Sequence, residues 1–508
     1  MVLTVYAVIA ASFIYVVYVH ISTYLKRRSY SHIASFPIPL TWKWYLGNLY
    51  LMRKKGSEMG LEGPSFSFSK VTEALRKELE TESYVIFFPG VALVYTVSIP
   101  VVSKVFSDHK TFLKQDPRAG RLAYVNGERV FGHNGLLTEA GTDVWYYKRK
   151  MMDPAFQKKF LKCLMGDMTN SANKLCQYLE GKKSQNAIDI YGIMNRVALE
   201  IVCTCGFSLK DDFIMRETSD LNKATESIFE VLTLSFRSRG GFSFRLPWKF
   251  REEKRRLKDA CALMRGTMRA LLTKRMKKNS EDPESISNDV LDHIIKGNNF
   301  SDKISIEDIC DDFFVFLVAG METTAITMSI TIWLLLKHPE ISEKVVKEVN
   351  EVYGEKDELD YEDLNRLVFL EQCIKECLRM HPPAELSSRV SPKHDVTING
   401  LLIPGKSIIM LPTEAIQSLE AHWPDPHIFD PDRFAPGKKI EPFTYFPFTA
   451  GPRQCIGKHF AIMEAKVVLA KFYRTFNYYD PYPEKTTLEK KTALTAKPKN
   501  GVFIGIEH

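Results

Sequence analysis

A cysteine near the carboxyl end lies in a loop whose residue types suit a metal-bound thiolate. Residues 448–457 read FTAGPRQCIG, and a helix-like run follows them. Gly451 and Gly457 let the backbone approach the Cys455 sulfur closely, and amides at the start of the following helix can donate toward it. A lone cysteine is ordinarily a small buried hydrophobe, so it is the loop that favours a metal.

The residues of the loop also limit which metal could bind. Zinc requires further Cys or His ligands at short spacing, and residues 448–457 hold one Cys and no His. One protein thiolate on a metal whose other ligands come from elsewhere points to haem.

A second candidate stretch, residues 319–324 (AGMETT), lies midway along an apolar run. The pattern predicts a helix with Ser305 as its cap and Asp308 in the capping-box position, ending before Pro339. Thr323 can bond the carbonyl four residues back and open the helix locally. The ordinary alternative is a locally satisfied Thr and a surface Glu.

Two further pairs share a helix face. Glu376 and Arg379 are three residues apart, and Pro382 follows them and ends that helix. Trp145 and Arg149 are four residues apart, which on its own describes an amphipathic face with solvated charges.

The elements that must position these residues are mostly helices. Strand signals cluster at residues 84–88, 91–97 and 396–410, with Pro-Gly or Asn-Gly turns between them. Helical spacing of apolar residues covers most of 145–277, 305–337 and 340–380. We therefore expect a mainly α fold with small β-sheets.

Composition limits the protein class. The chain has 508 residues, 45% of them hydrophobic and 26% charged, with a net charge of +8. This balance is typical of a globular protein and excludes collagen-like, disordered and multi-pass membrane classes. Nine Cys at no framework spacing indicate thiols in a reducing compartment. The basic excess is too small and too dispersed to indicate nucleic-acid binding.

The amino terminus predicts a membrane anchor. Residues 2–25 carry no formal charge, and a helix of that length spans roughly 36 Å against a bilayer core of about 30 Å. A cleaved signal peptide would have its positive charge before the apolar run, whereas here the basic residues 26–28 follow it. The positive-inside rule then keeps the rest of the chain in the cytosol. We expect an anchor at 1–25, a basic and Pro-rich hinge at 26–40, and one large domain at 41–508.

The cysteine loop resembles the ten-residue signature of the cytochromes P-450. Five residues carry the match: Phe448, Gly451, Arg453, Cys455 and Gly457. Three other stretches match in order and spacing, so the resemblance covers the chain from the hinge to the end. It implies the cytochrome P-450 fold, in a haem-thiolate monooxygenase of the microsomal type.

The resemblance also implies roles for the residues described above. On the distal side of the haem, Ala319 and Gly320 would leave room for oxygen, while Glu322 and Thr323 would organise the protons that cleave the O–O bond. A structural charge network would consist of Glu376, Arg379 and Arg433.

The expected haem contacts come from separate parts of the chain. The iron ligand is the Cys455 thiolate, and the other cofactor-binding residues are Trp145, Arg149, Arg389, Phe448, Arg453 and Gly457. Lys148, Lys150 and Lys458 would lie near the proximal face and attract an acidic electron donor.

The electron donor must be another protein, because the chain has no GxGxxG dinucleotide fingerprint. The resemblance implies an NADPH-dependent cytochrome P-450 reductase, with NADPH acting only through it. It also implies O2 as co-substrate and the endoplasmic reticulum membrane as location, with a single pass and a cytosolic catalytic domain.

Four stretches carry a finer likeness within the family: residues 126–132 (NGERVFG), 135–137 (GLL), 443–448 (FTYFPF) and 465–468 (AKVV). They look most like the cholesterol 24-hydroxylase group, which favours a sterol or other lipophilic substrate. The expected lining residues are Leu122, Tyr124, Val125, Phe131, Phe316, Ala319, Ala384, Leu386 and Leu494. Glu385 stands where that group has a large apolar side chain, which argues against cholesterol itself. The alternatives are a fatty-acid or xenobiotic hydroxylase, a haem-thiolate isomerase or dehydratase, and a non-catalytic membrane lipid-binding protein.

Overall fold

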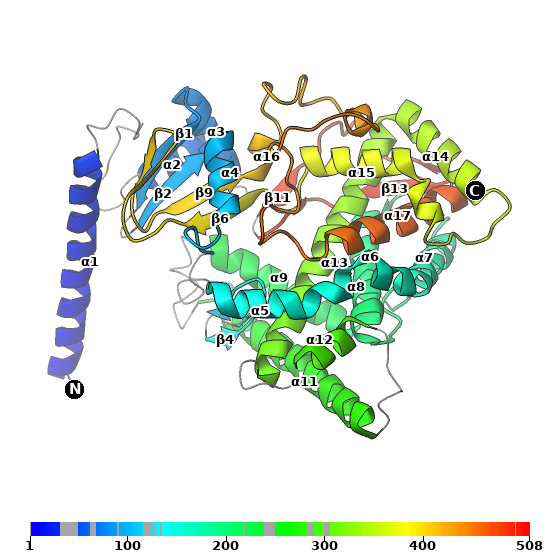
Figure 1. Cartoon of the computed structure of the whole chain (residues 1–508), viewed down its shortest axis with the longest axis horizontal. Coiled ribbons are helices and arrows are strands. Elements are labelled where there is room, and N and C mark those ends of the chain that lie inside the picture. Colours follow the sequence, from blue (N-terminus) through cyan, green and yellow to red (C-terminus); the bar gives the residue numbers. More distant parts are fainter. Residues whose placement is uncertain are drawn as a thin grey trace. The chain divides into compact units, whose positions relative to one another are not determined.

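The computed structural model divides into two compact units (Figure 1). It describes residues 2–30, 49–60, 68–88, 91–114, 124–125, 127–132, 135–216, 219–237, 249–281, 289–298, 305–492 and 494–507. Unit 1 combines Met1–Gln115, Glu385–Leu419 and Glu441–Gln454, and unit 2 combines Asp116–Ala384, Glu420–Ile440 and Cys455–His508. Unit 1 is assembled from three separate stretches of the chain, which is why no linker marks it in the sequence.

Unit 1 is built on a four-stranded sheet of order β1-β2-β9-β6. Its strands are β1 (Ser83–Phe88), β2 (Val91–Thr96), β9 (Ile408–Pro412) and β6 (Leu386–Val390). The predicted β1–β2 hairpin is antiparallel and β9 joins it in parallel, so two distant stretches of sequence share one sheet. A second hairpin pairs β7 (Val396–Ile398) with β8 (Leu401–Ile403), and its turn residues Asn399 and Gly400 have φ of 47° and 77°.

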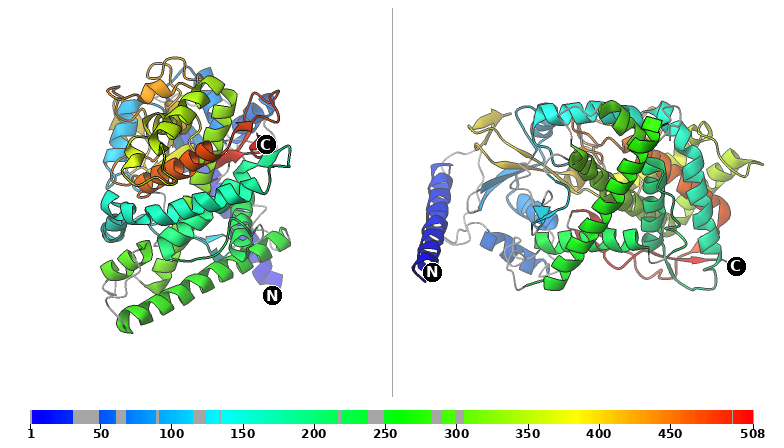
Figure 2. Two further views of the ribbon diagram at one scale, coloured as in Figure 1. Left: turned by 90° about the vertical axis from the view of Figure 1, so that its right-hand side faces the viewer. Right: turned by 90° about the horizontal axis from the view of Figure 1, so that it is seen from below.

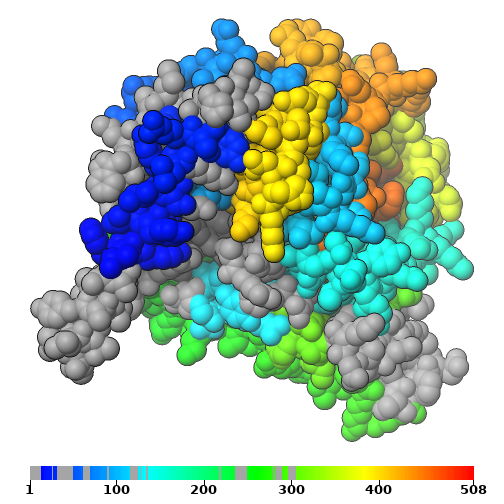
Figure 3. Space-filling model, turned by 60° about the vertical axis from the view of Figure 1, so that its left-hand side comes forward, coloured from blue at the N-terminus to red at the C-terminus, as the bar shows by residue number. Residues whose placement is uncertain are grey.

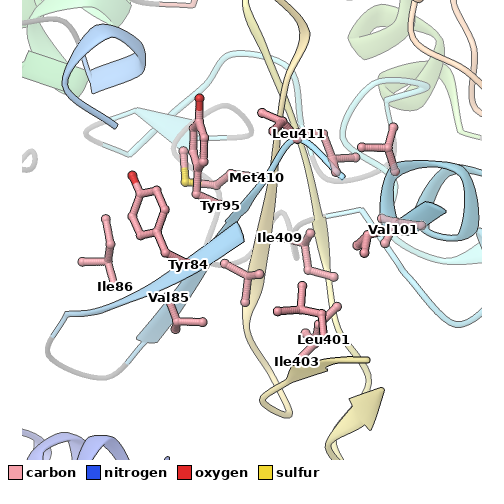
Figure 4. Packing of buried hydrophobic residues seen from close by; sticks show 14 of the residues in the cluster. Tyr84, Val85, Ile86, Tyr95, Val101, Leu401, Ile403, Ile409, Met410 and Leu411 are labelled. Carbon is pink, nitrogen blue, oxygen red and sulfur yellow. The ribbon is translucent and has the colours of Figure 1, made fainter. Parts of the chain in front are cut away.

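The core of unit 1 lies between this sheet and its helices (Figure 4). The helices are α2 (Leu49–Glu58), α3 (Phe68–Glu78), α4 (Ile99–Ser107) and the short α16 (Thr413–Ile416). Tyr84 and Tyr95 are fully buried, with ring centroids 5.2 Å apart. The Tyr84 hydroxyl donates to the Thr72 carbonyl at 2.7 Å, so that the buried polar atom is satisfied.

Unit 2 is mainly helical, as the sequence predicts. Its principal helices are α5 (Thr142–Met152), α7 (Met165–Glu180), α8 (Ile190–Phe207), α9 (Asp220–Arg237), α11 (Arg251–Glu281), α12 (Val290–Asn298), α13 (Ile306–Lys337), α14 (Pro339–Tyr353), α15 (Val368–Met380) and α17 (Lys458–Thr475). Short helical segments are η2 (Asp153–Phe156), α6 (Lys158–Leu161), η3 (Lys162–Leu164), η5 (Asp363–Asn365) and η6 (Pro431–Phe434). Its small sheets are formed by β3 (Tyr124–Val125) with β4 (Glu128–Arg129), β11 (Lys490–Thr492) with β12 (Ala496–Pro498), and β10 (Tyr478–Tyr479), β13 (Phe503–Ile506) and β5 (Ile188–Asp189) together. Helices α9 and α11 lie side by side (Figure 2).

Helix α13 is the centre of unit 2. It begins with the predicted capping box, in which the Asp308 amide donates to the Ser305 hydroxyl and the Asp308 carboxylate accepts from the Ser305 amide. It packs closely against α8, because a Cβ on Gly320 would lie 2.9 Å from the Val202 side chain. By length and composition α8 and α13 could cross a membrane, but 72% and 78% of their most apolar windows are buried among the described residues. They are core helices.

The amino-terminal apolar run forms one helix, α1 (Val2–Tyr30), which continues through the basic residues that follow it. Figure 3 shows the described part of α1 in dark blue. Among its described side chains, Phe13, Ile14 and Tyr15 are each more than 65% exposed. Such a face is unusual for a helix in water. Most of the predicted hinge, from residue 31 to residue 40, lies outside the described residues.

Candidate functional site

The cysteine loop is held in unit 1 by a glycine that no other residue can replace. Gly451 has φ of 73°, and a Cβ there would lie 2.2 Å from the Phe106 carbonyl oxygen in α4. The loop backbone therefore rests directly on the end of that helix. Phe448 is half-buried, and the Thr449 hydroxyl donates to the Arg453 carbonyl at 3.4 Å, which closes the loop over itself.

In unit 2 the Cys455 thiol precedes the first turn of α17 and is exposed. Gly457 is the N-cap of α17, and a Cβ there would lie in ordinary contact, at 3.9 Å, with the Cys455 sulfur. A thiolate at this place benefits from the amides of the first helical turn. None of the nine cysteines, all of them in the described part of the chain, forms a disulfide.

Arg389 in β6 supplies the test of whether an anionic cofactor fits. Its side chain is buried, and its Nε and Nη2 have no hydrogen-bond partner among the described residues. Its Nη1 donates to the Ser388 carbonyl at 2.8 Å, and the guanidinium lies 5.2 Å from the Phe106 ring centroid. Burial lowers the pKa of Arg389 to about 10. A buried cation with two unused donors fits a carboxylate such as a haem propionate.

Other predicted propionate partners also occupy suitable surroundings within their own units. Arg453 in unit 1 is buried. Trp145 in α5 of unit 2 is 3% exposed, and the Arg149 Nε lies 2.6 Å from the Asp153 carboxylate. Arg453 and Trp145 are therefore shielded from solvent, while Arg149 is held by a neighbouring acid.

The prediction for Lys148 is wrong. The resemblance placed it near the proximal face with Lys150 and Lys458, but Lys148 is fully buried. Its ammonium donates to the Asp312 carboxylate of α13 at 2.7 Å. Burial raises the pKa of Asp312 to about 6, and the Lys148 charge opposes this. Lys150 and Lys458 are exposed, as expected.

Lys148 belongs to a larger buried charge cluster that sequence reasoning missed. Asp311 is fully buried and accepts from Arg129 of β4 and from Arg265 of α11, the latter at 2.8 Å. Gly132 packs on the same carboxylate, since a Cβ there would lie 1.7 Å from the Asp311 Oδ2. The cluster fastens the segment before α5 to the central helix.

The signal for this cluster was available in the sequence. Four carboxylates, those of Glu307, Asp308, Asp311 and Asp312, fall within the first two turns of a helix that is largely apolar beyond them. Buried carboxylates require cationic partners. The sequence therefore predicts ion pairs at these carboxylates, although it does not identify the partner residues.

Midway along α13 the predicted distal residues separate into two faces. Ala319 is exposed and Thr323 half-exposed, and the Thr323 hydroxyl donates to the Ala319 carbonyl at 2.6 Å. Gly320 faces α8, as its tight approach to Val202 shows. The structure thus gives this glycine a packing reason beyond the room for oxygen that the resemblance implies.

Glu322 is directed away from the open face. Its carboxylate is buried, accepts from the Lys497 ammonium at 2.9 Å, and also accepts from the Thr495 hydroxyl. Both partners lie in or beside β12, more than 170 residues later in the chain. Sequence reasoning named Glu322 but not the residues that hold it.

A cavity of about 570 Å³ opens on this side of α13. Glu322 and Met321 line it, together with residues of α7, α8, α9 and the β11–β12 hairpin. None of the predicted substrate-lining residues contributes to it.

The predicted lining residues have varied surroundings. Phe131 and Val125 are buried, and the Phe131 ring makes an edge contact with Phe314 in α13. Phe316 packs on Phe156, at 5.6 Å between ring centroids. Tyr124 is exposed, while Ala384, Leu386 and Leu494 are half-buried. Leu122 lies outside the described residues.

The predicted structural network is assembled within unit 2. Arg379 donates twice to Glu376, at 2.7 and 2.8 Å, and both side chains are fully inaccessible to solvent. Arg433 in η6 lies 3.4 Å from the same carboxylate. Arg379 also donates to the Pro426 carbonyl at 2.8 Å. Removing one partner of such a buried pair costs about 3 to 5 kcal/mol.

Comparison with known proteins adds a family. The cytochrome P450 family model matches residues 37–504. Cytochrome P450 4F4 of Rattus norvegicus is 28% identical, covering 96% of this chain and 92% of its own length. Leukotriene-B4 omega-hydroxylase 3 of Mus musculus is 28% identical with the same coverage. Cytochrome P450 4F2 of Homo sapiens is 30% identical over 74% of each chain. These relatives do not support the likeness to the cholesterol 24-hydroxylase group.

Proposed function

The chain belongs to the cytochrome P450 family, whose model covers it from residue 37 to residue 504, and from this premise we propose that it hydroxylates a long-chain fatty acid or a related lipid carboxylate. The family makes it a haem-thiolate monooxygenase that takes its electrons from a reductase. The coarser part of the sequence prediction, a monooxygenase acting on a lipophilic substrate, is confirmed. The proposal concerns the substrate and the residue roles.

When bound, the haem would supply an iron centre at which O2, two electrons and two protons place one oxygen atom in a C–H bond and release the other as water. The protein's own side chains would hold the haem and position the proton donor. Cys455 would bind the iron as thiolate, with Gly457 and the amides of α17 near its sulfur. Arg389, Arg453, Trp145 and Arg149 would hold the propionates.

Thr323 would hold a proton donor at the exposed middle of α13. Its hydroxyl is fixed by the bond to the Ala319 carbonyl, so its oxygen remains available as an acceptor on the open side. Ala319 beside it leaves that face uncrowded. Together these residues would keep a small space where a proton can be delivered without side-chain obstruction.

The substrate class rests on the relatives. A mouse relative matching 96% of this chain is named for omega-hydroxylation of leukotriene B4, which favours a fatty-acid substrate over the sterol suggested by the likeness to the cholesterol 24-hydroxylase group. The largely apolar predicted lining suits a lipid chain. The buried acidic Glu385 is an unfavourable neighbour for a sterol's apolar rings.

We extend the proposal to the protein's surroundings. Residues 1–25 would anchor it in the endoplasmic reticulum membrane, and residues 41–508 would form the cytosolic haem domain. Since α1 continues to Tyr30, the predicted hinge at 26–40 would be confined to residues 31–40. The exposed apolar side chains of α1 support the anchor. The exposed Lys150 and Lys458 would attract an acidic surface of the NADPH-dependent reductase.

The experiment uses the full-length protein in phospholipid vesicles with NADPH–cytochrome P450 reductase. We expect palmitate to yield hydroxylated acid with matching NADPH consumption, and cholesterol to yield no product. Cys455→Ala should lose the red-shifted Soret band of the reduced carbon monoxide complex and all turnover. Hydroxylation of cholesterol without any product from palmitate would contradict the substrate class. A thiolate Soret band that persists in Cys455→Ala would contradict the assignment of the iron ligand.

A further inference from the structure

Beside the open face of α13, one carboxylate joins the central helix to a hairpin near the end of the chain. We propose that Lys497 and Thr495, through Glu322, clamp the β11–β12 hairpin to α13 and thereby fix the substrate's orientation. Lys497 is then a positioning residue. The inference rests on the proposed function, since it assumes that Leu494 in the hairpin loop contacts the substrate.

Both oxygens of the Glu322 carboxylate are used by the hairpin. Its Oε1 accepts from the Lys497 ammonium at 2.9 Å, and its Oε2 accepts from the Thr495 hydroxyl. Glu322 is 2% exposed, and the Lys497 side chain is 24% exposed. A carboxylate that is buried and doubly held in this way is strongly coupled to its partners, because removing one of them leaves a desolvated charge.

The hairpin's geometry aims both partners at the helix. Thr492 pairs with Ala496, and Lys491 with Lys497. Thr495 directly precedes β12 and lies two residues before Lys497. Side chains two apart along an extended chain lie on the same side. Leu494 directly precedes the clamped Thr495, and its backbone position is therefore set by the same contact.

A backbone hydrogen bond holds the hairpin at another point. The Ala496 amide donates to the Pro383 carbonyl at 2.9 Å, directly before the predicted lining residue Ala384. This backbone bond would hold the strand's position along the chain. The side-chain clamp ties the hairpin to α13 itself through a charge, so it would help to set how the loop tip approaches the helix.

Lys497 also reaches a third element. Its ammonium lies 5.4 Å from the centroid of the Phe229 ring in α9, a distance at which a cation and an aromatic face attract one another. The 570 Å³ cavity opens beside these residues, with Phe229, Glu322 and Lys497 in its wall. The clamp would therefore couple α9, α13 and the hairpin without being sealed inside the protein.

This role differs from the proton delivery that the resemblance implies for Glu322. A proton donor must face the reacting group, whereas this carboxylate is turned to the hairpin. The two roles predict different results for a charge exchange. If Glu322 and Lys497 form a clamp, exchanging the two residues should preserve its function, because the opposite charges still meet. If Glu322 is a proton donor, the exchange should abolish its function, because position 322 no longer carries an acid.

The first test compares Lys497→Met with the matched control Lys499→Met. Lys499 lies in the same hairpin region and pairs with Glu489 at 2.9 Å, but its side chain is 46% exposed. We expect Lys497→Met to retain haem and to weaken palmitate binding roughly tenfold, as judged by the type I spectral shift without reductase. It should also spread hydroxylation over several carbons. Lys499→Met should bind and react as the parent does, and imidazole should bind all three proteins equally.

Two further variants keep the test decisive if Lys497→Met folds poorly. Thr495→Val removes only the hydroxyl and should weaken palmitate binding roughly threefold. The exchange Glu322→Lys with Lys497→Glu should restore both affinity and product distribution to within about threefold of the parent. A Lys497→Met or Thr495→Val protein that matches the parent in both readouts would overturn the clamp, as would an exchange variant with intact haem but no recovery.

Failure of the proposed function would be recognised separately. If the parent binds cholesterol and not palmitate, the fatty-acid assignment is wrong, and the same variants are then compared with cholesterol as the probe. A loss of positioning would still appear as weaker binding and mixed products. The clamp and the substrate class are thus judged by different comparisons.

Discussion

Arg389 is the single residue that most directly indicates a missing anion. Its charge is buried and its Nε and Nη2 are unused among the described residues, which costs free energy unless an acid completes the site. The sequence identified this arginine through resemblance alone. The structure adds a physical reason, because burial without compensation lowers the pKa of Arg389 to about 10.

Replacing Arg389 should have opposite effects on the protein with and without haem. In Arg389→Ala we expect haem loss to accelerate by roughly tenfold or more, because one propionate loses its cation. The haem-free protein should become more heat-stable, because an uncompensated charge is removed. Transfer of haem to apomyoglobin and the melting temperature measure the two effects. Arg216→Ala, at an exposed ion pair with Asp211, is the control. A faster haem loss there, or unchanged haem loss in Arg389→Ala, would contradict the assignment.

Thr323 offers a second prediction with a control in the same helix. Thr323→Ala should lower the product formed per NADPH consumed several-fold, because the fixed hydroxyl on the open face is lost. Thr327 makes the same kind of bond, donating to the Thr323 carbonyl at 2.9 Å, but it is buried. Thr327→Ala should keep the parent ratio. Equal ratios in the two variants would remove Thr323 from proton delivery.

Sequence reasoning was strongest where the partners are local. Ser305 and Asp308 form the predicted capping box, and Thr323 bonds four residues back as expected. It failed where partners are distant. Lys148 was assigned to the surface because nothing near it in sequence shows that Asp312, 164 residues later, will face it. The partners of Glu322 were missed for the same reason.

At the scale of elements, the charges on α13 determine how the preceding segments are held. Asp311 and Asp312 are fully buried and receive cations from β4, α11 and α5. A helix so apolar would otherwise bind its neighbours without fixing their register, because apolar contacts are not directional. The ion pairs supply that direction, and they place Phe131 against the ring of Phe314.

Asp312 gives this arrangement a measurable pH dependence. Its pKa rises from 3.8 to about 6 on folding, so between about pH 4 and about pH 6 the folded state retains a proton that the unfolded state has lost. Its contribution to stability therefore falls as pH rises through that window, by roughly 3 kcal/mol in total.

Asp312→Asn removes this dependence. We expect the parent's advantage in free energy of unfolding over Asp312→Asn to decrease as pH rises from about 4 to about 6. Denaturant titrations at a series of pH values measure it. A parent advantage that grows with pH would show that Asp312 is ionised throughout.

At the scale of the whole molecule, the sequence anticipated the helical class and the small sheets but not the division into two units. Unit 1 draws β1 and β2 from the amino-terminal part and β6 and β9 from residues some 300 later. Local patterns reveal the strands, whereas the parallel pairing of β2 with β9 depends on a shared core that spacing does not encode.

The amino-terminal helix carries the prediction at this scale. Removing residues 2–30 should move the protein from the membrane pellet to the supernatant after extraction at alkaline pH, because the exposed apolar face of α1 is lost. The reduced carbon monoxide spectrum should be preserved. A truncated protein that stays in the pellet would show that other surfaces hold it to the membrane.

The shared carboxylate of Asp311 also limits how this chain can exchange parts with its relatives. Arg129 and Arg265 are 136 residues apart, yet the Arg265 guanidinium donates to the Arg129 carbonyl and both side chains meet at Asp311. A chimera with a crossover between them inherits the acid from one parent and a cation from the other. Recombinants that take Arg129, Arg265 and Asp311 from different parents should be less frequent among folded clones than recombinants that keep the three residues together. The three positions should therefore be inherited together.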